Sequence, residues 1–485
     1  MSVTVSRSPR PFAGERFHFS GVGGSGMAPL AILAASLGAE VSGSDRNRDR
    51  GLDLPVFADL RSAGVRLVAQ DGSGVLPGID ALVHSAAVEP SNPDVSRADQ
   101  LGIERIRRGS FLAGIAATRR TVAVAGTSGK STVTAMVAHI LIEAGLEPWF
   151  LGGGAAVRLR GALAPGSLRL GRSDWFVVET DESDGSVAEF SPAIAVLTNL
   201  SRDHKEIAET ARNFGSLLAK TRERAVIHVG DPVLELVERP AALPLLRVAR
   251  EGDPHWATPD LLARSIRLDS VSTRFRVDDS EVLVPFPGSL TVENALLALG
   301  AAVAACVALP VAAAALETFA GVRRRLERVG SAAGVDVFDD FGHNPIKIAA
   351  ALEALRPSRA FWVYYQPHGY GPTRFFRDQL IETFQRSLAD GDRLLLAPIY
   401  DAGGTADRSI RSEDLVSALR HAGVEASVAS TREDAARRIA EGVRPGDRVV
   451  VMGARDDTLP GFARDVLAAI AARSSAAAPA RESAR

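Results

Sequence analysis

The sequence is poor in cysteine, in lysine and in net charge. Its one cysteine, Cys306, rules out an intramolecular disulfide framework, and we expect it to be a small buried hydrophobe in a reducing compartment. A net charge of -2 provides neither a basic field for nucleic acid nor an acidic tail. No signal peptide or membrane span is predicted, because Pro310 interrupts the alanine-rich run over residues 295–316, which is typical of buried helix surface. We therefore expect a cytoplasmic protein that binds small molecules, with no nucleic acid and no membrane as partner.

The chain has 485 residues, of which 46% are hydrophobic, and is longer than one core usually supports. Alternating strand and helix patterns predict an α/β fold. We predict an N-terminal Rossmann-like domain over residues 16–117, a central phosphate-loop domain with a mostly parallel sheet over 118–322, and a Rossmann-like, doubly wound domain over 323–473. Residues 1–15 and 474–485 are predicted to be a flexible leader and a disordered tail.

The scarcity of lysine makes Lys130 conspicuous, because it stands where a β-branched strand runs into a glycine turn and a helix. The turn consists of Gly126, Thr127, Ser128, Gly129, Lys130, Ser131 and Thr132. Such a turn directs backbone N–H groups at phosphate, the lysine meets the β- and γ-phosphates, and the hydroxyls meet a bound Mg²⁺. Val124 replaces the first glycine of the general motif, so the alternative is an ordinary strand-to-helix corner with a surface lysine. The strand before the turn and the helix after it favour a phosphate-binding loop.

A second glycine turn, Gly21 to Met27, follows the first predicted strand and opens an apolar helix. Its glycines would let the backbone approach a diphosphate at the N-terminus of that helix. The next strand ends in Ser44 and Asp45, about twenty residues further on, where a ribose hydroxyl is expected. The alternative is a tight strand-to-helix turn that binds no ligand.

Polar residues end two buried strands of the central domain. Glu179 to Asp184 is an acidic cluster after one strand, and Asn199 to His204 follows another. Because the carboxyl ends of parallel strands meet at one edge of a sheet, we expect both stretches to converge on the phosphate loop and to hold Mg²⁺. The alternative for the cluster is a solvated acidic turn.

Three further stretches lie in the C-terminal third. Arg323 to Arg325 is either a solvated linker at a domain junction or a source of ligands for phosphate oxygens. Polar loops with histidines follow two predicted strands, at residues 339–345 and 366–374.

These stretches, in this order and over nearly the whole chain, resemble the Mur ligase family, the ATP-dependent amide-bond ligases of peptidoglycan precursor synthesis. The resemblance implies an ADP-forming acid–amino-acid ligase with ATP and Mg²⁺ as cofactors. Its first-guess substrates are L-alanine and the carboxylate of a UDP-sugar, UDP-N-acetylmuramate, joined through an acyl-phosphate.

The same resemblance implies a set of site residues. The catalytic residues would be Lys130, Glu179, His204 and Arg325, and the metal ligands would be Ser131, Thr132, Glu179 and His204. ATP would be bound by Gly126, Thr127, Ser128, Gly129, Lys130, Ser131, Thr132, Asn294, Arg325, Asp340 and His343. The UDP-sugar would be bound by Gly23, Gly24, Ser25, Gly26, Met27, Ser44, Asp45, His84, Ser85 and Arg107. The amino acid would enter near His368, Tyr370 and Arg374.

Some positions depart from the family pattern on the acceptor and metal side. Ser128 and Asn344 replace histidines, and Gly369 replaces a basic or aromatic residue. These departures leave the acceptor open, so the alternatives are a related ligase for muramyl-peptide recycling or a specialised metabolite, and a catalytically silent nucleotide-binding relative. A dehydrogenase interpretation of the first glycine turn leaves the phosphate loop unexplained. Lys205 and Lys220 are positional candidates for the carbamylated lysine of some relatives, with an ordinary surface lysine favoured.

Overall fold

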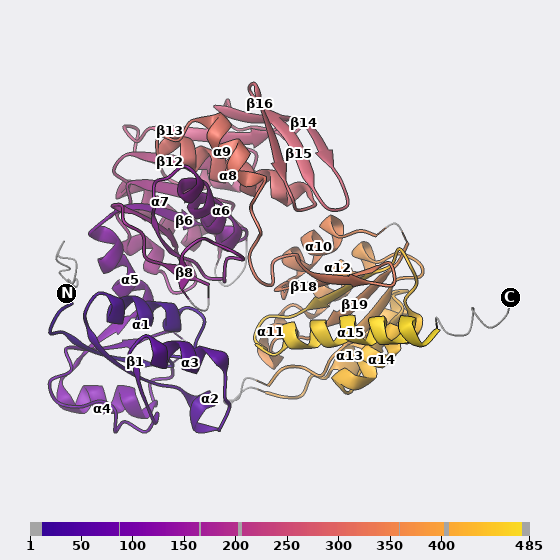
Figure 1. Cartoon of the computed structure of the whole chain (residues 1–485), viewed down its shortest axis with the longest axis horizontal. Coiled ribbons are helices and arrows are strands. Elements are labelled where there is room, and N and C mark those ends of the chain that lie inside the picture. Colours follow the sequence, from indigo (N-terminus) through magenta and orange to yellow (C-terminus); the bar gives the residue numbers. More distant parts are fainter. Residues whose placement is uncertain are drawn as a thin grey trace. The chain divides into compact units, whose positions relative to one another are not determined.

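The computed structural model describes residues 12–86, 88–163, 166–201, 206–357, 359–401 and 407–477 (Figure 1). The chain packs as two compact units. Unit 1 contains the chain up to Arg267 together with Arg274–Pro285 and Val292–Val322, and unit 2 contains Arg323 onward together with Leu268–Thr273 and Phe286–Thr291. The first two predicted domains share unit 1, because the helix that leaves the first sheet packs against the central domain.

The first sheet of unit 1 is parallel, in the order β3-β2-β1-β4-β5, as predicted for a doubly wound domain. Its strands are β1 (Arg16–Ser20), β2 (Glu40–Ser44), β3 (Arg66–Val68), β4 (Ala81–His84) and β5 (Glu104–Arg107). Its helices are α1 (Met27–Ser36), α2 (Arg46–Asp49), α3 (Pro55–Ser62), α4 (Pro93–Leu101) and α5 (Arg108–Ala117). The glycine turn joins β1 to the buried helix α1, which places the turn at the carboxyl edge of the sheet.

The second sheet of unit 1 has 11 strands, in the order β16-β15-β14-β13-β12-β11-β6-β10-β7-β9-β8. They are β6 (Arg120–Ala125), β7 (Trp149–Leu151), β8 (Ala162–Leu163), β9 (Leu168–Arg169), β10 (Trp175–Glu179), β11 (Ile194–Leu197), β12 (Arg224–His228), β13 (Leu245–Arg250), β14 (Leu261–Leu268), β15 (Thr273–Val277) and β16 (Ser280–Val284). The helical segments are α6 (Lys130–Glu143), α7 (Ile207–Ala219), α8 (Ser289–Ala304), α9 (Leu309–Leu316), and the 3-10 turns η1 (Ser186–Glu189) and η2 (Pro232–Leu236). β6 lies between the parallel strands β11 and β10, so the loops after all three meet at one edge.

The sheet of unit 2 has the order β17-β18-β22-β19-β20-β21, with β17 antiparallel to β18 and the other pairs parallel. Its strands are β17 (Glu327–Ala332), β18 (Val335–Asp340), β19 (Phe361–Tyr365), β20 (Arg393–Leu396), β21 (Ala426–Val428) and β22 (Arg448–Met452). Its helices are α10 (Pro345–Ala354), α11 (Tyr370–Phe375), α12 (Arg377–Ser387), α13 (Ser412–His421), α14 (Arg432–Gly442) and α15 (Leu459–Ala477).

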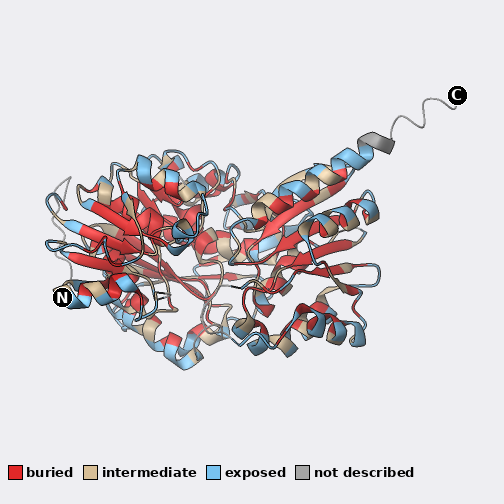
Figure 2. Ribbon diagram, turned by 90° about the horizontal axis from the view of Figure 1, so that it is seen from below, coloured by how far each residue is buried: buried red, intermediate tan, exposed pale blue. Residues whose placement is uncertain are grey.

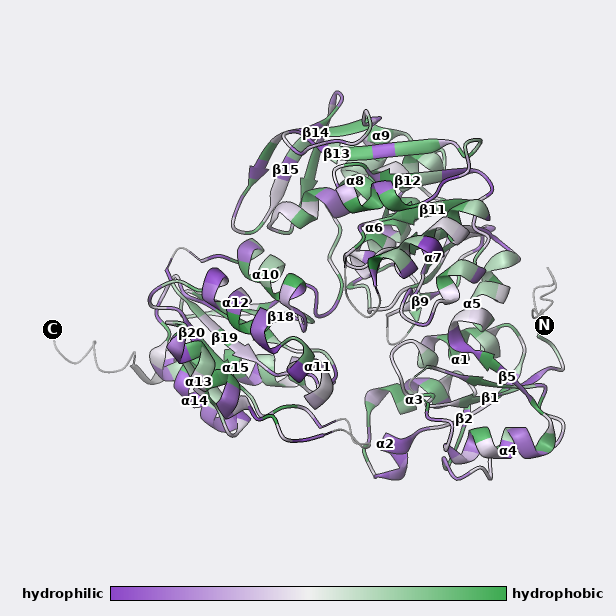
Figure 3. Cartoon of the chain, turned by 180° about the vertical axis from the view of Figure 1, so that it is seen from behind, coloured by the Kyte–Doolittle hydropathy of each residue, from purple (hydrophilic) through white to green (hydrophobic). Residues whose placement is uncertain are grey.

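Both faces of the unit 2 sheet are buried. Phe361, Val363 and Tyr365 belong to one apolar cluster, and Trp362 and Tyr364 belong to the other, because successive strand residues point to opposite faces. The strands are accordingly buried in Figure 2 and mostly hydrophobic in Figure 3, whereas the outer sides of the helices are exposed and hydrophilic.

Several predictions about the periphery need correction. Phe12, predicted to lie in a loose leader, is 0% exposed and stacks on Phe111, because its ring fills the apolar core of the first sheet. Helix α15 continues to Ala477 into the predicted disordered tail, of which residues 478–485 lie outside the described residues. Cys306 is exposed, because it occupies a turn with φ 67° after α8, and it is not a buried hydrophobe.

The alanine-rich run forms two helices, α8 and α9, that end and begin on either side of that turn. In the part of the chain that the structure describes, no helix is long and apolar enough to cross a membrane.

Candidate functional site

The phosphate loop has the backbone that its glycines were predicted to provide. Gly126 and Gly129 adopt φ values of 143° and 82°, which side-chain-bearing residues rarely reach. α6 begins at Lys130, directly after Gly129, so its N-terminus faces the loop. A Cβ at Gly129 would lie 2.4 Å from Asn294 Oδ1, which places the predicted Asn294 beside the loop.

The end of β11 fixes the loop from the side. The Ser128 N–H donates to Asn199 Oδ1 at 2.9 Å, and the Thr198 hydroxyl and the Asn199 amide donate to the Ser128 carbonyl. Thr127 Oγ1 is hydrogen-bonded to the backbone of Ser201. Ser128, one of the departures from the family pattern, is therefore held through its backbone N–H and carbonyl.

Lys130 carries a carboxylate partner that the prediction did not single out within the acidic cluster. Its Nζ donates to the Gly126 carbonyl at 2.6 Å and lies 3.0 and 2.8 Å from Glu182 Oε1 and Oε2. Oε2, despite the short distance, makes no hydrogen bond, so it is off the donor direction. Burial raises the pKa of Glu182, and the charge of Lys130 opposes that shift. The Glu182 carboxylate thus occupies the position beside Lys130 Nζ where phosphate oxygens would bind in a phosphate loop.

Glu179 ends β10, at the edge where the loop lies, and is held by a glycine run that the sequence analysis passed over. The Gly153 N–H donates to Glu179 Oε2 at 2.7 Å. A Cβ at Gly153 would lie 2.6 Å from Glu179 Oε1, so glycine is what allows the carboxylate to approach this loop. The signal in the sequence was the run Gly152 to Gly154 after β7.

The metal ligands predicted beside the loop are only partly described. His204 lies outside the described residues, as does Lys205, and Lys220 Nζ donates to the Ala188 carbonyl at 2.7 Å on an exposed surface. Among the described residues no group of three histidine, cysteine or acidic side chains is arranged to hold a metal ion. The remaining oxygen donors, Ser131, Thr132 and Glu179, have the hard chemistry that Mg²⁺ prefers.

The glycine turn of the first domain is braced by acidic residues. Gly23 donates its N–H to Asp45 Oδ2 at 2.9 Å, and Asn47 donates to Oδ1 at 2.8 Å, so Asp45 caps α2 as well as the turn. Beneath them Ser20 and Ser44 donate to the fully buried Asp94.

Burial alone would raise the pKa of Asp94, but hydrogen bonds from His18, Ser44 and Ser20 outweigh it and lower that pKa. Ser44, predicted to bind a UDP-sugar, therefore has a structural partner in a network that no motif indicates.

An arginine next to the predicted Arg107 lies against the same turn. A Cβ at Gly26 would lie 2.8 Å from Arg108 Nη1, whereas Arg107 is exposed. His84, whose pKa is lowered by burial, lies within 3.2 Å of the Ser85 carbonyl through Nδ1. The roles of Arg107, His84 and Ser85 stay predictions, and Arg108 is the residue that the sequence analysis missed.

Unit 2 brings several predicted residues together in a row of rings. The Arg325 guanidinium lies 4.8 Å from the Phe341 ring, which contacts the ring of His343 edge-on. The His343 ring in turn lies 4.8 Å from that of His368. The loops after β18 and β19, together with the segment that precedes the antiparallel strand β17, therefore place these side chains at one edge of the sheet.

The two acidic residues that end β18 are fully buried or nearly so. Asp340, predicted to bind ATP, accepts N–H groups from Leu326 and Gly342 at 2.8 and 2.7 Å. Burial raises the pKa of Asp339 to about 6, against the opposing charge of Arg324. Asp340 thus shapes the loops on either side of it.

The predicted amino-acid side of unit 2 is an arginine-rich loop region. Gly369 has φ 140°, a conformation that favours glycine, and precedes α11, which carries Tyr370 and Arg374. Arg374 pairs with Asp407 at 3.0 Å. The backbone conformation at this position thus explains why glycine stands there. Asn344, the other departure in unit 2, caps α10 by accepting the Lys347 N–H at 2.9 Å, a role for which asparagine is well suited.

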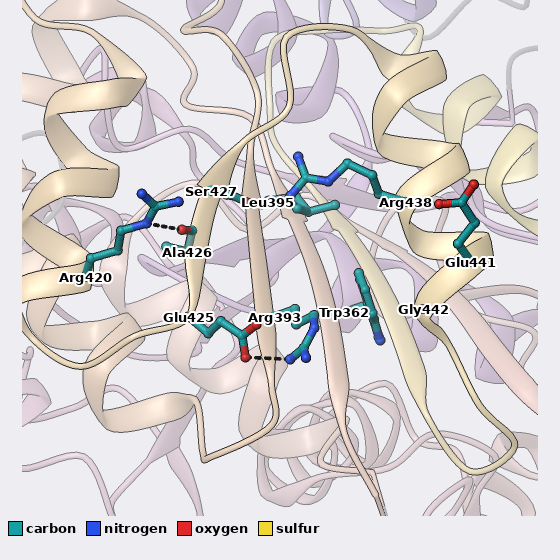
Figure 4. Close-up of a pocket in the computed structure, with 10 residues that line it drawn as sticks. All are labelled: Trp362, Arg393, Leu395, Arg420, Glu425, Ala426, Ser427, Arg438, Glu441 and Gly442. Atoms are coloured by element: carbon teal, nitrogen blue, oxygen red, sulfur yellow. Dashed lines mark hydrogen bonds and ion pairs between the residues drawn. The ribbon is translucent and has the colours of Figure 1, made fainter.

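A cavity of about 540 Å³ opens at the opposite, amino-terminal edge of the unit 2 sheet (Figure 4). Trp362 and three arginines line it, and all three arginines are already engaged: Arg393 with Glu425 at 2.5 Å, Arg420 with the Ala426 carbonyl at 2.7 Å, and Arg438 with the Val428 carbonyl at 3.0 Å. It contains none of the predicted site residues.

The folds and the two glycine turns define a multidomain α/β nucleotide-binding enzyme with a phosphate loop, and comparisons with known proteins identify its family. Residues 16–120 match the model of the Mur ligase family, catalytic domain, residues 124–302 the Mur ligase middle domain, and residues 324–455 the Mur ligase, glutamate ligase domain. The chain belongs to the Mur ligase family and is an ATP-dependent ligase.

Similar proteins cover nearly the whole chain. A UDP-N-acetylmuramate–L-alanine ligase of Sorangium cellulosum is 36% identical over 455 residues, which are 90% of this chain and 93% of that protein. One from Bdellovibrio bacteriovorus is 33% identical over 91% of this chain and 96% of that protein.

Two solved structures have the same fold. The UDP-N-acetylmuramate–alanine ligase of Thermotoga maritima superimposes with a TM-score of 0.74 at 22% identity, covering 95% of this chain and 99% of that chain. A murein peptide ligase of Psychrobacter arcticus gives 0.67 at 25% identity, covering 94% and 99%.

Proposed function

We propose that this protein joins L-alanine to the carboxylate of UDP-N-acetylmuramate with conversion of ATP to ADP and phosphate. The observation that carries the proposal is the phosphate loop whose Lys130 is paired with the buried Glu182, beside Glu179 at the end of β10. The choice of substrates follows the names of relatives that are 32–36% identical over 90–91% of the chain. ATP and a UDP-sugar are cytoplasmic metabolites, so we place the reaction in the cytoplasm.

The chemistry requires activation of a poor acyl donor. The carboxylate oxygen of the UDP-sugar attacks the γ-phosphorus of ATP, and ADP leaves. The amine of L-alanine then attacks the acyl-phosphate, and a tetrahedral intermediate collapses to the amide and inorganic phosphate. The protein mainly positions the reactants and stabilises charge on the transferred phosphoryl group. Lys130 supplies such a charge once its Nζ exchanges the Glu182 carboxylate for phosphate oxygens.

Mg²⁺ would be held by the hydroxyl of Ser131 or Thr132 and by the carboxylate of Glu179, with His204 proposed for a second ion. When bound, it supplies positive charge that neutralises the phosphate oxygens. Glu179 suits this role, because it ends β10 beside β6 and its carboxylate is held by the Gly153 N–H.

The remaining predicted residues keep their proposed roles. In unit 1 we propose that Asn294, which lies beside Gly129, meets the adenine of ATP. In unit 2 we propose Arg325, Asp340 and His343 for the nucleotide and His368, Tyr370 and Arg374 for the amino acid. The row from Arg325 to His368 supports a common site for these side chains.

The test is phosphate release by the purified protein with ATP, Mg²⁺ and UDP-N-acetylmuramate, screened against single amino acids and small peptides. We expect release that depends on L-alanine, with the amide product visible by mass spectrometry. Stimulation by a different amine alone would keep the ligase mechanism and overturn the acceptor. No stimulation by any amine would overturn UDP-N-acetylmuramate as the donor.

A further inference from the structure

The guanidinium of Arg108 lies between the Gly21–Met27 turn and Asp181 of the acidic turn that follows β10. Arg108 is the first residue of α5, the helix that connects the first sheet to β6 and the phosphate loop. Its Nη2 donates to Asp181 Oδ2 at 2.6 Å, and its side chain is 19% exposed. A Cβ on Gly26 would lie 2.8 Å from Nη1 and 3.3 Å from Cζ, so the guanidinium lies directly against the Gly21–Met27 turn.

That turn has no cation of its own. The N-cap of α1 is Gly26, which has no side chain to cap the helix, and the first turn of α1 contains no acidic residue. The positive end of the helix dipole is therefore uncompensated by α1 itself. An anion placed there would meet backbone N–H groups and, in addition, the Nε and Nη1 donors that Arg108 does not use for Asp181.

Asp181 connects Arg108 with the residue that pairs with the phosphate loop. Its Oδ1 accepts the N–H and the hydroxyl of Ser183 at 2.9 and 2.6 Å, which fixes the acidic turn. The next residue, Glu182, pairs with Lys130. Gly109, the residue after Arg108, packs closely against the end of the acidic turn, because a Cβ there would lie 1.9 Å from Ser186 Oγ. Two ion pairs on consecutive residues thus connect the first glycine turn to the lysine of the second.

We propose that Arg108 binds the diphosphate of the nucleotide sugar at the Gly21–Met27 turn and, through Asp181, positions the acidic turn that presents Glu182 to Lys130. The inference rests on the proposed function, since the UDP-sugar provides the diphosphate. Asp181 and the diphosphate then share the single positive charge of one guanidinium, through different nitrogen atoms. Removal of the arginine weakens diphosphate binding, whereas removal of the negative charge of Asp181 strengthens it. A merely structural ion pair would respond to both changes alike.

The experiment measures the affinity of the full chain for UDP by titration calorimetry. Arg108→Ala is expected to weaken UDP binding by about tenfold, and Asp181→Asn to tighten it by roughly two- to fivefold, as for charge-assisted contacts to phosphate. Arg61→Ala, which removes an exposed arginine of α3, is expected to leave UDP affinity unchanged. Thermal unfolding of each variant checks that it folds, and Arg108→Lys, which keeps the charge without the planar fork, is expected to lie between wild type and Arg108→Ala.

A second readout tests the connection to the phosphate loop. In wild type, saturating ATP with Mg²⁺ is expected to change the UDP affinity. This change is expected to disappear in Asp181→Asn, because the ion pair that connects Arg108 to the acidic turn with Glu182 is then lost. Loss of UDP affinity in both ion-pair variants, an unchanged affinity in Arg108→Ala, or a wild type that does not bind UDP would each overturn the inference. Intact UDP binding without L-alanine-dependent turnover would instead contradict only the proposed function.

Discussion

The two glycine turns of unit 1 have the same local design and obtain their charge differently. Each joins a buried parallel strand to the N-terminus of an apolar helix, β1 to α1 and β6 to α6. The second turn carries its cation, Lys130, in its own sequence. The first contains glycine, valine, serine and methionine but no charged residue, and its cation, Arg108, comes from 82 positions further along the chain than Gly26 (108 minus 26).

The difference explains what each turn can be expected to tolerate. Lys130 is the first residue of α6, so the turn and the helix start place its backbone next to the phosphate loop. Arg108 is placed by the packing of α5 against the central domain and by Asp181. The first turn therefore depends on tertiary structure for its cation, whereas the second turn carries its cation in its own sequence.

The largest effect is expected from Lys130→Ala. It removes the charge that the second turn supplies itself, so turnover should fall on the order of 10³-fold while the protein stays folded. Phosphate release and far-UV circular dichroism measure the two outcomes. Arg212→Ala, an exposed residue of α7, serves as control. Retained ligation would remove the distinction between the turns, since the lysine would then have no role at phosphate.

Gly153→Ala should sharpen the comparison with a smaller effect. The added Cβ would lie 2.6 Å from the Glu179 carboxylate, which is the end of a flexible side chain and can move. We expect kcat to fall roughly 10- to 100-fold with little change in the unfolding midpoint. Gly171→Ala is the contrasting variant, because its Cβ would lie 2.0 Å from the rigid Glu147 carbonyl and should lower stability instead. Unchanged kcat in Gly153→Ala would contradict a role for Glu179 at the phosphate loop.

Asp94→Asn tests the buried support of the first turn through pH. The pKa of Asp94 is depressed below 3.8, so its contribution to folding is present above that value and is lost as pH falls through the folded pKa. We expect the variant to lose about 1–3 kcal/mol of unfolding free energy at neutral pH. Urea unfolding across the acid range should show this difference shrinking. The pKa of Glu182 at the second turn is shifted in the opposite direction. Because it is raised, Glu182 favours the native state at lower pH. A difference that is independent of pH would refute the assignment to Asp94.

The smallest effect is expected from Asp45→Ala. Asp45 accepts N–H groups from Gly23 and Asn47, and loss of such a cap costs about 1 kcal/mol. The variant should therefore lose stability even without ligand, which a residue that only binds ribose would not do. Chemical unfolding without UDP measures the loss of stability, and calorimetry with UDP measures any loss of UDP affinity. Wild-type stability with weakened UDP binding would assign Asp45 to the ligand alone.

Much of the fold and part of the site could be predicted from the sequence. The apolar runs predicted β1, β6, β10 and β19 close to their bounds, because a strand that is buried on both faces is a short continuous apolar run, which is a local property of the sequence. Short elements such as α4 and β7 were missed. The two prolines of residues 90–93 are typical of a turn, yet Asn92 caps α4 and Pro93 is its first residue, a position that proline also favours.

The sequence by itself determined the two glycine turns, the lysine and the acidic strand end, since these depend on residues within a few positions of one another. Only the tertiary structure decided which charges face them. The pairing of Lys130 with Glu182, of Gly153 with Glu179 and of Arg108 with Asp181 joins segments 26 to 73 positions apart. Such contacts follow from the order of strands in a sheet, which no local pattern records, because each strand end is compatible with many neighbours until packing selects one.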